Sequence, residues 1–444
     1  MVRTVEHEKR VLFITYFYPP VRTAGAVRTA NMAKYLAKTG WIVTVVTPAV
    51  ASWNSEALET SVSPDANTQP GLTTLPTEHL LKFLMPGYTT AGPSSPRYSL
   101  GGACRWLARR LDIPADVGWA IAAYRICRNL DPEDLDVILV SGGPFASFAL
   151  AWMLSRRLQR PYVQDYRDLW TGNPHAPRPV RRWSHWIERR LLRDASQVLA
   201  AAPAAAAYLA RLAGADKVRV VTNGYDPEEM AAVEPCRFDH FAILYAGRFY
   251  PPRRSAAPVM AALARLEKVH PANGREWLFH YYGPHSAHIA EEAARHGISN
   301  RIKLHGNVGR PAALSAIKGA GVSIVITSVG SETDAATRGI ITSKLFDALG
   351  LGTPILGITP PTSDANAILG TISNASSYPG TDVEGIAKRI KALLDADEPA
   401  AMPTRTHAWP MLAEETGKAL NVAIEAHHHG QCLPSCSNAA DSTE

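Results

Sequence analysis

The sequence predicts an α/β protein built from two doubly wound domains, each with a parallel sheet between layers of helices. Short apolar runs of strand length alternate along the chain with longer segments whose apolar residues recur at helical spacing. Between the two series, the alternation stops over residues 222–241, where turn residues, acids and two prolines gather, and then starts again. A chain of 444 residues is long enough for two such domains.

The chain opens with a strand, a helix and a second strand. Residues 11–14 (VLFI) form an apolar run typical of a buried strand, and residues 26–39 place small and apolar side chains on one helical face. Gly40 is a natural helix stop, and residues 41–46 form the next strand, which we expect Pro48 to end. This order indicates a crossover between two parallel strands.

The rest of the first domain, residues 1–222, is less regular. Residues 49–100 are dense in Ser, Thr, Pro and Gly, which predicts a long irregular loop. The regular pattern then resumes, with strands expected at 136–140, 162–164, 198–200 and 218–221 and helices at 145–158 and 180–193.

A linker at 223–240 leads to a second domain, residues 241–405. Its expected strands are 242–245, 277–281, 302–304, 322–326 and 354–357. Its expected helices are 255–270, 286–296, 311–318, 343–350 and 382–395. A last helix follows at about 411–426, and the Gly-, Ser-, Asn- and Ala-rich residues 427–444 predict a disordered tail.

Composition excludes several classes of protein. No apolar stretch approaches the roughly 18 residues of a membrane span, and the polar N-terminus lacks the apolar region of a signal peptide. Five cysteines in so long a chain form no disulfide framework, which favours the cytoplasm. Cys432 and Cys436 lie near three histidines, but their spacing and setting disfavour zinc, and we expect no metal site.

The charge is uneven. The net charge is +6, with 46 Lys and Arg against 40 Asp and Glu. Residues 1–220 hold 27 basic and 17 acidic residues, for a net +10, whereas residues 221–444 are net −4. This asymmetry suggests an anionic partner for the first domain.

Three loops that follow predicted strands carry candidate binding residues. Ligands of open α/β sheets bind at the carboxyl ends of the strands, so a cleft between two such domains is the default site. In the first loop, Gly25 lies where a helix begins and lets a phosphate approach backbone N–H groups. A plain turn would need Gly equally well.

The second and third loops lie in the second domain. Residues 243–255 (ILYAGRFYPPRRS) end a strand at Gly247 and add three arginines that suit a diphosphate: Arg248, Arg253 and Arg254. A helix then opens at Thr342 and Ser343, with Lys344 beside them and Asp347 one turn on, where an acid can bind a ribose. Each loop alone also has a purely structural interpretation, as a solvated basic loop or a capped helix. Together they indicate a ligand with a diphosphate.

At this point the sequence resembles the GT-B glycosyltransferases, specifically family 4, over about residues 9–426. The resemblance rests on VLFITYFYPPVRTAGAVRTANMAKYLAKTGWIVTVVTP, PYVQDYRDLW, VTNGYDPEE, LYAGRFYPPRRS and SKLFDALGLGTPIL. It implies two Rossmann-like domains facing a central cleft, with the helix at about 411–426 crossing back to the first domain. It also implies a retaining glycosyltransferase of the hexosyltransferase type.

The resemblance further implies the partners and the roles of residues. The second domain would hold a nucleotide-diphosphate sugar, with a UDP-sugar favoured, and no cofactor or metal would be required. Arg248 and Arg253 match the pair on the diphosphate, with Arg254 as a substitute. Gly25 matches the Gly that touches the phosphate, Asn307 and Val308 the segment that reads the base, and Asp347 the acid on the ribose. The acceptor would be a small molecule or lipid-linked, in secondary-metabolite or cell-envelope biosynthesis.

Two positions depart from the family pattern. The family's first acid falls on Gly339, with Glu332 and Asp334 nearby but out of register. Where many relatives have a His, this chain has Arg167 followed by Asp168, and either could orient the sugar or the acceptor. Two alternatives therefore stay open: a nucleotide-sugar hydrolase or epimerase that uses Asp168 with His175, and a non-catalytic nucleotide-sugar binding protein.

The arginine-rich helix at 180–193 has three readings. Trp183, Trp186, Ile187 and Leu191 would form one apolar face with arginines beside it. We favour a surface helix whose tryptophans pack on the domain. An interfacial helix that meets anionic lipid at the inner membrane face is the alternative, and nucleic acid is disfavoured because no nucleic-acid module is present.

Overall fold

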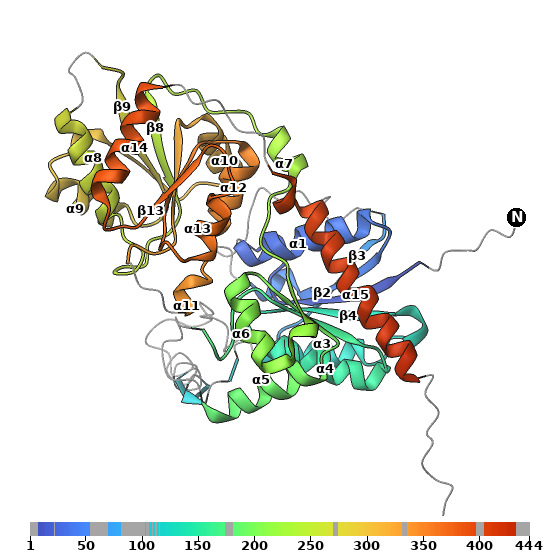
Figure 1. The fold of residues 1–444 in the computed structure, drawn as a ribbon. Coiled ribbons are helices and arrows are strands. Elements are labelled where there is room, and N and C mark those ends of the chain that lie inside the picture. The colour runs from blue at the N-terminus through green and yellow to red at the C-terminus, as the bar shows by residue number, and fades with distance from the viewer. Residues whose placement is uncertain are drawn as a thin grey trace, which may run out of the picture. The chain divides into compact units, whose positions relative to one another are not determined.

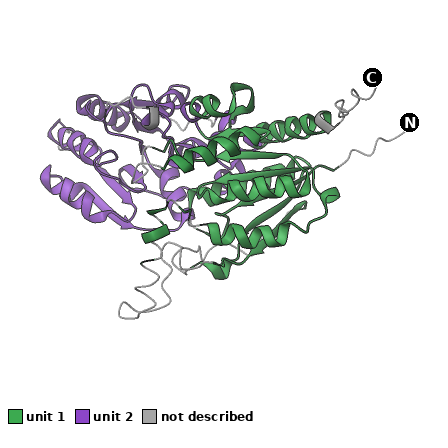
Figure 2. Cartoon of the chain, turned by 90° about the horizontal axis from the view of Figure 1, so that it is seen from below, with its two compact units in different colours: residues 1–201, 206–221, 413–444 green, residues 202–205, 222–412 purple. Residues whose placement is uncertain are grey.

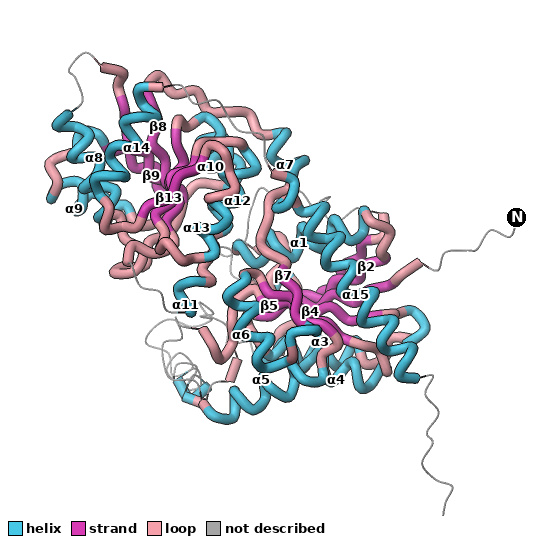
Figure 3. The backbone as a smooth tube through the Cα atoms, in the orientation of Figure 1, coloured by secondary structure: helices cyan, strands magenta, loops and turns pink. Residues whose placement is uncertain are grey.

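The computed structural model describes residues 8–21, 23–53, 70–80, 103, 106–108, 110–111, 113–114, 116–173, 181–269, 274–330, 335–396 and 404–431. The chain divides into two compact units (Figure 2). Unit 1 comprises residues 1–201, 206–221 and 413–444, and unit 2 comprises residues 202–205 and 222–412. In each unit a strand layer is flanked by helices (Figure 3).

Unit 1 is built on a seven-stranded parallel sheet in the order β3-β2-β1-β4-β5-β6-β7. The strands are β1 (Arg10–Thr15), β2 (Ile42–Pro48), β3 (Leu72–Thr77), β4 (Val137–Gly142), β5 (Tyr162–Tyr166), β6 (Gln197–Ala200) and β7 (Val218–Val220). The helices are α1 (Ala24–Lys38), α3 (Val117–Cys127), α4 (Ala146–Leu158), α5 (Arg182–Asp194) and α6 (Pro203–Ala213). In Figure 1, α1 and α15 lie on one side of this sheet and α3 and α4 on the other.

The strand order of unit 1 reverses between β1 and β4. The chain runs outward from β1 through β2 to β3, and then returns to place β4 on the other side of β1. All six residues of β4 are buried, because helices cover both faces of a parallel sheet. The crevice outside the carboxyl ends of β1 and β4 is therefore the ligand position that this topology favours.

The predicted irregular stretch at 49–100 is wrong in part, because it contains β3. This strand (LTTLPT) alternates little and includes Pro76, so its sequence does not read as a strand. β3 lies at the edge of the sheet, where a proline is tolerated because its missing N–H is not needed on the open side. The helices α3 and α6 were also not foreseen, whereas the other elements predicted for unit 1 are confirmed within a few residues.

Unit 2 holds a six-stranded parallel sheet in the order β10-β9-β8-β11-β12-β13. The strands are β8 (Phe241–Ala246), β9 (Trp277–Tyr282), β10 (Ile302–Gly306), β11 (Val322–Ile326), β12 (Ile355–Ile358) and β13 (Ala375–Tyr378). The helices are α7 (Pro227–Ala232), α8 (Ala257–Val269), α9 (Ser286–Arg295), α10 (Arg310–Gly319), α11 (Ala335–Arg338), α12 (Ser343–Leu351), α13 (Asp364–Leu369) and α14 (Val383–Asp395). The reversal here lies between β8 and β11.

Two apolar layers hold unit 2 together. One packs α8, α9 and α14 against the sheet through residues such as Trp277, Phe279 and Ile390. The other packs α7, α10, α12 and α13 against the opposite face through residues such as Leu244 and Phe346. The sheet is thus covered on both faces, as the alternating sequence pattern predicts.

The linker predicted at 223–240 is more ordered than its sequence suggests. It contains α7, whose N-cap Asp226 accepts a hydrogen bond from Glu228 N at 2.9 Å. Tyr225 N donates to His407 O at 3.0 Å, and Trp409 N donates to Tyr225 O at 3.0 Å. The first and last segments of unit 2 therefore lie side by side at an isolated parallel bridge between Tyr225 and Ala408.

The last helix, α15 (Trp409–Gln431), begins in unit 2 and enters unit 1 at Ala413. A Cβ placed on Gly417 would lie 3.3 Å from Trp41 Nε1, so α15 packs closely beside β2 of unit 1. The predicted disordered tail is wrong for residues 427–431, which continue this helix. Residues 432–444, with Cys432 and Cys436, lie outside the described residues.

Within the described ranges, no helix is both long and apolar enough to cross a bilayer. The same ranges hold no group of three or more His, Cys, Asp or Glu side chains arranged to hold a metal ion. Cys127 and Cys236 are free thiols.

A chain of imidazoles crosses one face of the unit 2 sheet. His240 Nε2 lies 2.7 Å from His280 Nε2, and His280 Nδ1 lies 2.9 Å from His305 Nε2. Asp239 Oδ1 lies 2.5 Å from His240 Nδ1 at one end. Burial above all, and then the nearby His240, His305 and Lys303, lower the pKa of His280 to about 4, against a smaller opposing effect of Asp239.

We expect acid to destabilise unit 2 through His280. Its pKa is lower in the folded state than the ordinary value of about 6.5, so the unfolded chain takes up a proton that the folded chain refuses until about pH 4. Stability is therefore lost as pH falls from about 6.5 toward 4. In His280→Gln, the fall in Tm between about pH 7.5 and pH 5 should shrink, as measured by differential scanning calorimetry. An equal fall in wild type and variant would contradict this, and the exposed His428→Gln serves as the control.

Candidate functional site

The carboxyl ends of β8 and β11 in unit 2 carry a compact basic loop. Tyr250 N donates to Arg254 O at 2.8 Å and Arg254 N to Tyr250 O at 3.0 Å, which closes residues 250–254 into a tight turn. Val329 N donates to Arg253 O at 2.8 Å and so ties this turn to the segment after β11. The turn therefore lies at the reversal of strand order, where α/β sheets bind ligands.

The base of this loop requires a close backbone approach. Gly247 N donates to Tyr282 O at 2.9 Å, and Tyr281 hydroxyl donates to Gly247 O at 3.0 Å. A Cβ on Gly283 would lie 2.3 Å from Gly247 O, so any side chain at position 283 would push the loop outward. The carbonyl of Arg248 accepts from the Tyr245 hydroxyl at 3.1 Å, which holds the loop on the other side.

Cationic side chains from three segments converge here. Burial lowers the pKa of Lys344 from its ordinary value; Asp347 opposes this, and the positive charges of Arg310, Arg254 and Arg248 lower it further. Lys344 thus lies within the electric field of three guanidiniums. Arg254 Nε is buried without a hydrogen-bond partner, and its guanidinium lies 5.4 Å from the Tyr250 ring centroid. This concentration of positive charge suits a polyanion such as a diphosphate.

Arg253 differs from its neighbour. Its side chain is exposed, and it is not among the charges that act on Lys344, whereas Arg254 is. Of the two arginines that the sequence offers as partner to Arg248, the structure therefore brings Arg254 to Lys344. The role predicted for Arg253 on the diphosphate stays a prediction.

Arg310 and Glu229, which the sequence pattern did not single out, pair at this site beside the predicted Asp347. Its Nε and Nη2 atoms donate to the two carboxylate oxygens of Glu229 at 2.8 Å each, and Nη2 also donates to Asp347 Oδ1 at 3.0 Å. Burial disfavours the charged guanidinium, but Asp347 and Glu229 outweigh it and raise the pKa of Arg310. The sequence DPEE at 226–229 is typical of the start of a helix, but the surrounding residues 223–240 were predicted to be a linker.

Asp347 is 6% exposed, and its Oδ1 atom is engaged by Arg310. A ribose hydroxyl would therefore have to share this oxygen or bind Oδ2. The helix start at Thr342 and Ser343 is confirmed, since Thr342 is the N-cap of α12 and its hydroxyl accepts from Lys344 N at 3.4 Å. The predicted ribose contact of Asp347 stays a prediction.

The residues expected near the base lie farther along the sheet. Asn307 and Val308 are exposed and follow β10, the edge strand that is separated from β8 by β9. Gly339 follows the short helix α11, and no acid occupies this position. Glu332 and Asp334, the acids closest to it in sequence, lie outside the described residues.

In unit 1, three loops meet at Arg167. Its Nη2 atom donates to Gly143 O at 2.6 Å, in the loop after β4, and its guanidinium lies 5.2 Å from the Phe17 ring centroid, in the loop after β1. A Cβ on Gly25, in the first turn of α1, would lie 1.6 Å from Arg167 Nη1. Only Gly leaves room here for the guanidinium at the positive end of α1, an arrangement that an anion between them would stabilise.

Asp168 follows Arg167 and points outward. Its side chain is 64% exposed, and its Oδ2 atom lies 3.4 Å from Arg167 Nε. The structure thus brings Gly25, Arg167 and Asp168 together at the carboxyl edge of the unit 1 sheet. His175, the residue that a hydrolase or epimerase would pair with Asp168, lies outside the described residues.

A buried ion pair supports this edge from below. Arg28 Nη2 donates to Asp165 Oδ1 at 2.6 Å and Arg28 Nε to Asp165 Oδ2 at 3.1 Å, and neither side chain is more than 1% exposed. Ser141 hydroxyl donates to Asp165 Oδ2 at 2.9 Å, and Arg28 Nη2 donates to Val221 O at 2.8 Å. The pair joins α1, β4, β5 and the end of β7. Its only signal in the sequence is weak, a polar residue within each of two apolar segments.

Asp116 fixes the neighbouring loop in a similar way. It is fully buried, and its carboxylate oxygens accept from Ala146 N at 3.2 Å and from Ser147 N at 3.0 Å, at the start of α4. Burial raises the pKa of Asp116 to about 7, although these hydrogen bonds oppose the rise. This contact anchors the segment that presents Gly143 to Arg167.

Comparisons with known proteins agree with the two-unit architecture. Residues 23–224, somewhat under half of the chain, match the family described as "Glycosyl transferase 4-like domain". No curated protein sequence matches the chain at a significant level.

Solved structures match over nearly the whole chain. Sucrose-phosphate synthase from Thermosynechococcus elongatus aligns with a TM-score of 0.58 and 16% identity, over 95% of this chain and 98% of its own. Anabaena HepE in complex with UDP and glucose aligns with a TM-score of 0.55 and 12% identity, over 96% and 100%. A UDP-N-acetylglucosamine 2-epimerase, so assigned provisionally, from Listeria monocytogenes aligns with a TM-score of 0.55 and 17% identity, over 95% and 98%.

Because these sequence identities are low, the solved structures support only the fold of this chain. They match this chain's two parallel sheets with flanking helices, which is the fold that the sequence predicts. The family match adds the class of the amino-terminal domain. Residues 23–224 thus match a glycosyl transferase 4-like domain, and the chain as a whole has the GT-B fold of two doubly wound parallel sheets with flanking helices.

Proposed function

We propose that this protein transfers a hexosyl group from a nucleotide-diphosphate sugar, with a UDP-sugar favoured, to a hydroxyl group of an acceptor, with retention of the anomeric configuration. The observation that carries the proposal is the convergence of Arg248, Arg254, Arg310 and Lys344 at the strand reversal of unit 2. The match of residues 23–224 to a glycosyl transferase 4-like domain supports it, and Anabaena HepE, which shares the fold, has been solved with UDP and glucose.

The proposed chemistry follows from the charge of the leaving group. As the bond between the sugar C1 and the phosphate oxygen breaks, negative charge grows on the diphosphate. Arg248, Arg254 and Lys344, with the N-terminal amides of α12, would stabilise that charge in place of a metal ion. The sugar would pass through an oxocarbenium-like state, and the acceptor hydroxyl would attack from the face that the diphosphate leaves.

The remaining donor contacts are assigned on the resemblance. Asn307 and Val308 would meet the base, and Asp347 the ribose. Because Arg310 pairs with Asp347, it weakens the repulsion between this carboxylate and the diphosphate.

Unit 1 would bind the acceptor. Arg167 and Asp168 lie together at the carboxyl edge of its sheet, where they could orient an acceptor hydroxyl or the sugar. We propose a small-molecule or lipid-linked acceptor from secondary-metabolite or cell-envelope biosynthesis.

Calorimetric titration with UDP, GDP and ADP, followed by donor turnover with and without crude acceptor extracts, tests the proposal. Turnover that requires the extract, with an α-linked product from an α-linked donor by NMR, is the expected result. Nucleotide release or epimerised sugar without acceptor would instead assign a hydrolase or epimerase. Tight nucleotide binding with no turnover under any condition would assign a binding protein.

A further inference from the structure

The helix α5 of unit 1 presents tryptophans and arginines outward. Its buried residues are Ser184, Glu188, Leu191 and Leu192. Trp186 is 70% exposed and Trp183 is 38% exposed. The expectation that these tryptophans pack on the domain is therefore wrong for Trp186, because smaller residues occupy the inner face of the helix.

The exposed face of α5 forms a continuous stripe. Arg182, Trp186, Arg189 and Arg193 are all exposed and recur at spacings of four, three and four residues, which aligns them along one side of the helix. A tryptophan side chain can lie in the headgroup region of a bilayer, and the long arginine side chains beside it can reach the anionic headgroups.

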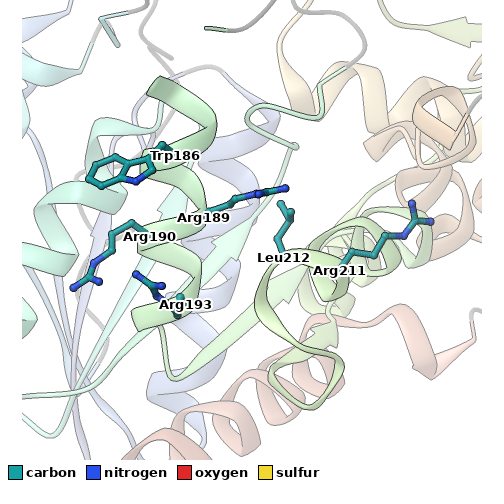
Figure 4. A pocket seen from close by; sticks show the side chains of 6 residues that line it. All are labelled: Trp186, Arg189, Arg190, Arg193, Arg211 and Leu212. Atoms are coloured by element: carbon teal, nitrogen blue, oxygen red, sulfur yellow. The ribbon is translucent and has the colours of Figure 1, made fainter. Parts of the chain in front are cut away.

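A basic pocket opens between this stripe and α6. It encloses about 410 Å³, and its lining is shown in Figure 4: Trp186, Arg189, Arg190, Arg193, Arg211 and Leu212. Arg189 extends from α5 toward Leu212 of α6 (Figure 4). Four guanidiniums and one indole thus surround a space large enough for a phosphorylated headgroup.

Little negative charge balances these arginines. Asp194 Oδ2 lies 3.3 Å from Arg190 Nη2 and 3.8 Å from Arg156 Nη2, and it also accepts from Trp152 Nε1 at 2.8 Å. Across the part of the chain that the structure describes, Arg189, Arg193 and Arg211 have no acidic partner. Their mutual repulsion favours an anionic ligand, and the arginine fork suits phosphate oxygens.

We propose that the outer face of α5, with the arginine pocket between α5 and α6, docks unit 1 on an anionic phospholipid bilayer and takes the lipid phosphates into the pocket. Positive charge with exposed indole favours a bilayer, because indole rings prefer the interface between headgroups and acyl chains. Other exposed apolar side chains in unit 1 include Trp106, Leu107 and Leu111.

The inner face of α5 links this surface to the candidate acceptor loop. Glu188 accepts a hydrogen bond from Thr171 N at 3.3 Å and contacts the Thr171 hydroxyl. Thr171 follows Asp168 by three residues in the same loop. Docking through α5 would therefore hold the acceptor loop at the membrane surface, which would suit a lipid-linked acceptor; this last step rests on the proposed function.

Vesicle flotation tests the docking surface. The full chain is mixed with vesicles of phosphatidylcholine alone or with about 30% phosphatidylglycerol, at about 0.1 M salt. Each arginine near an anionic bilayer contributes roughly a factor of five to partitioning, so Arg189→Ala/Arg193→Ala should bind about 25-fold more weakly. Trp186→Ala should also weaken binding, and about 0.5 M salt should release the wild type.

The matched control is Arg237→Ala/Lys268→Ala, which removes the same net charge from exposed positions of unit 2 and should bind as wild type does. UDP titration of each variant measures donor binding, and far-ultraviolet circular dichroism measures folding, both independently of docking. The proposal is overturned if phosphatidylglycerol does not increase the binding of the wild type to vesicles, or if the two double variants bind vesicles equally well. It is also overturned if a DNA duplex of about 20 base pairs displaces the protein from the vesicles at equal phosphate concentration.

Discussion

Arg248→Ala is expected to reduce sugar transfer by about 30- to 900-fold, equivalent to about 2–4 kcal/mol in the transition state. Arg248 follows β8 at the strand reversal of unit 2, and its charge acts on Lys344 together with those of Arg254 and Arg310. Charge on the departing diphosphate exceeds that in the bound donor, so the loss should fall mainly on kcat. The measurement is the initial rate of transfer at saturating and limiting donor, with the UDP affinity measured by calorimetry.

Two further variants make this test specific. Arg248→Lys keeps the positive charge but not the two-pronged geometry, and should fall between Arg248→Ala and wild type. Arg253→Ala and Arg254→Ala, compared side by side, decide which neighbour completes the clamp; the buried Nε of Arg254 favours the larger loss in Arg254→Ala. Transfer by Arg248→Ala at the wild-type rate would remove the diphosphate assignment from this loop.

Asp165→Ala is expected to destabilise unit 1 by about 3–5 kcal/mol, because it removes the buried carboxylate that pairs with the buried guanidinium of Arg28. Arg28 would keep its hydrogen bond to Val221 O but lose both carboxylate oxygens. Hydrogen exchange followed by mass spectrometry at β4 and β5 measures the change in this unit separately from unit 2.

The controls separate a buried charge from a lost salt bridge. Arg28→Met/Asp165→Leu removes both charges and should recover most of the stability, as apolar replacements of buried pairs commonly do. Asp134→Ala breaks the Arg10–Asp134 pair at 2.6 Å, whose side chains are 33% and 75% exposed, and should change stability by less than about 1 kcal/mol. Equal losses in Asp165→Ala and Asp134→Ala would show that burial of Arg28 carries no such cost.

Most of the fold could be predicted from periodicity alone. Strands such as 322–326 are continuous apolar runs, because both faces of a parallel sheet are buried. Several of the elements that escaped prediction lack that signal. β3 is an edge strand with a proline, and α6 consists largely of alanine. α7 is a short helix within a segment rich in turn residues. Their structure depends on neighbours that the local sequence does not reveal.

The candidate site divides in the same way. Gly25, Arg248 and Thr342 could be placed from sequence, since each follows a recognisable strand and begins or precedes a helix. Glu229 and Arg310 could not, because they are 81 residues apart and meet only when α7 packs near α10. Asp116 and the pair Arg28–Asp165 were missed for the same reason.

The sequence by itself determined the two doubly wound sheets, the order of their elements and the loops from which cations reach a ligand. These features are local: apolar period, helix ends and strand-end glycines are written in neighbouring residues. Only the tertiary structure decided which charged side chains interact. Asp347 pairs with Arg310, and Arg254 lies near enough to Lys344 to affect its pKa, because electrostatic energies depend on long-range contacts and burial. The tertiary structure likewise leaves Trp186 exposed among arginines.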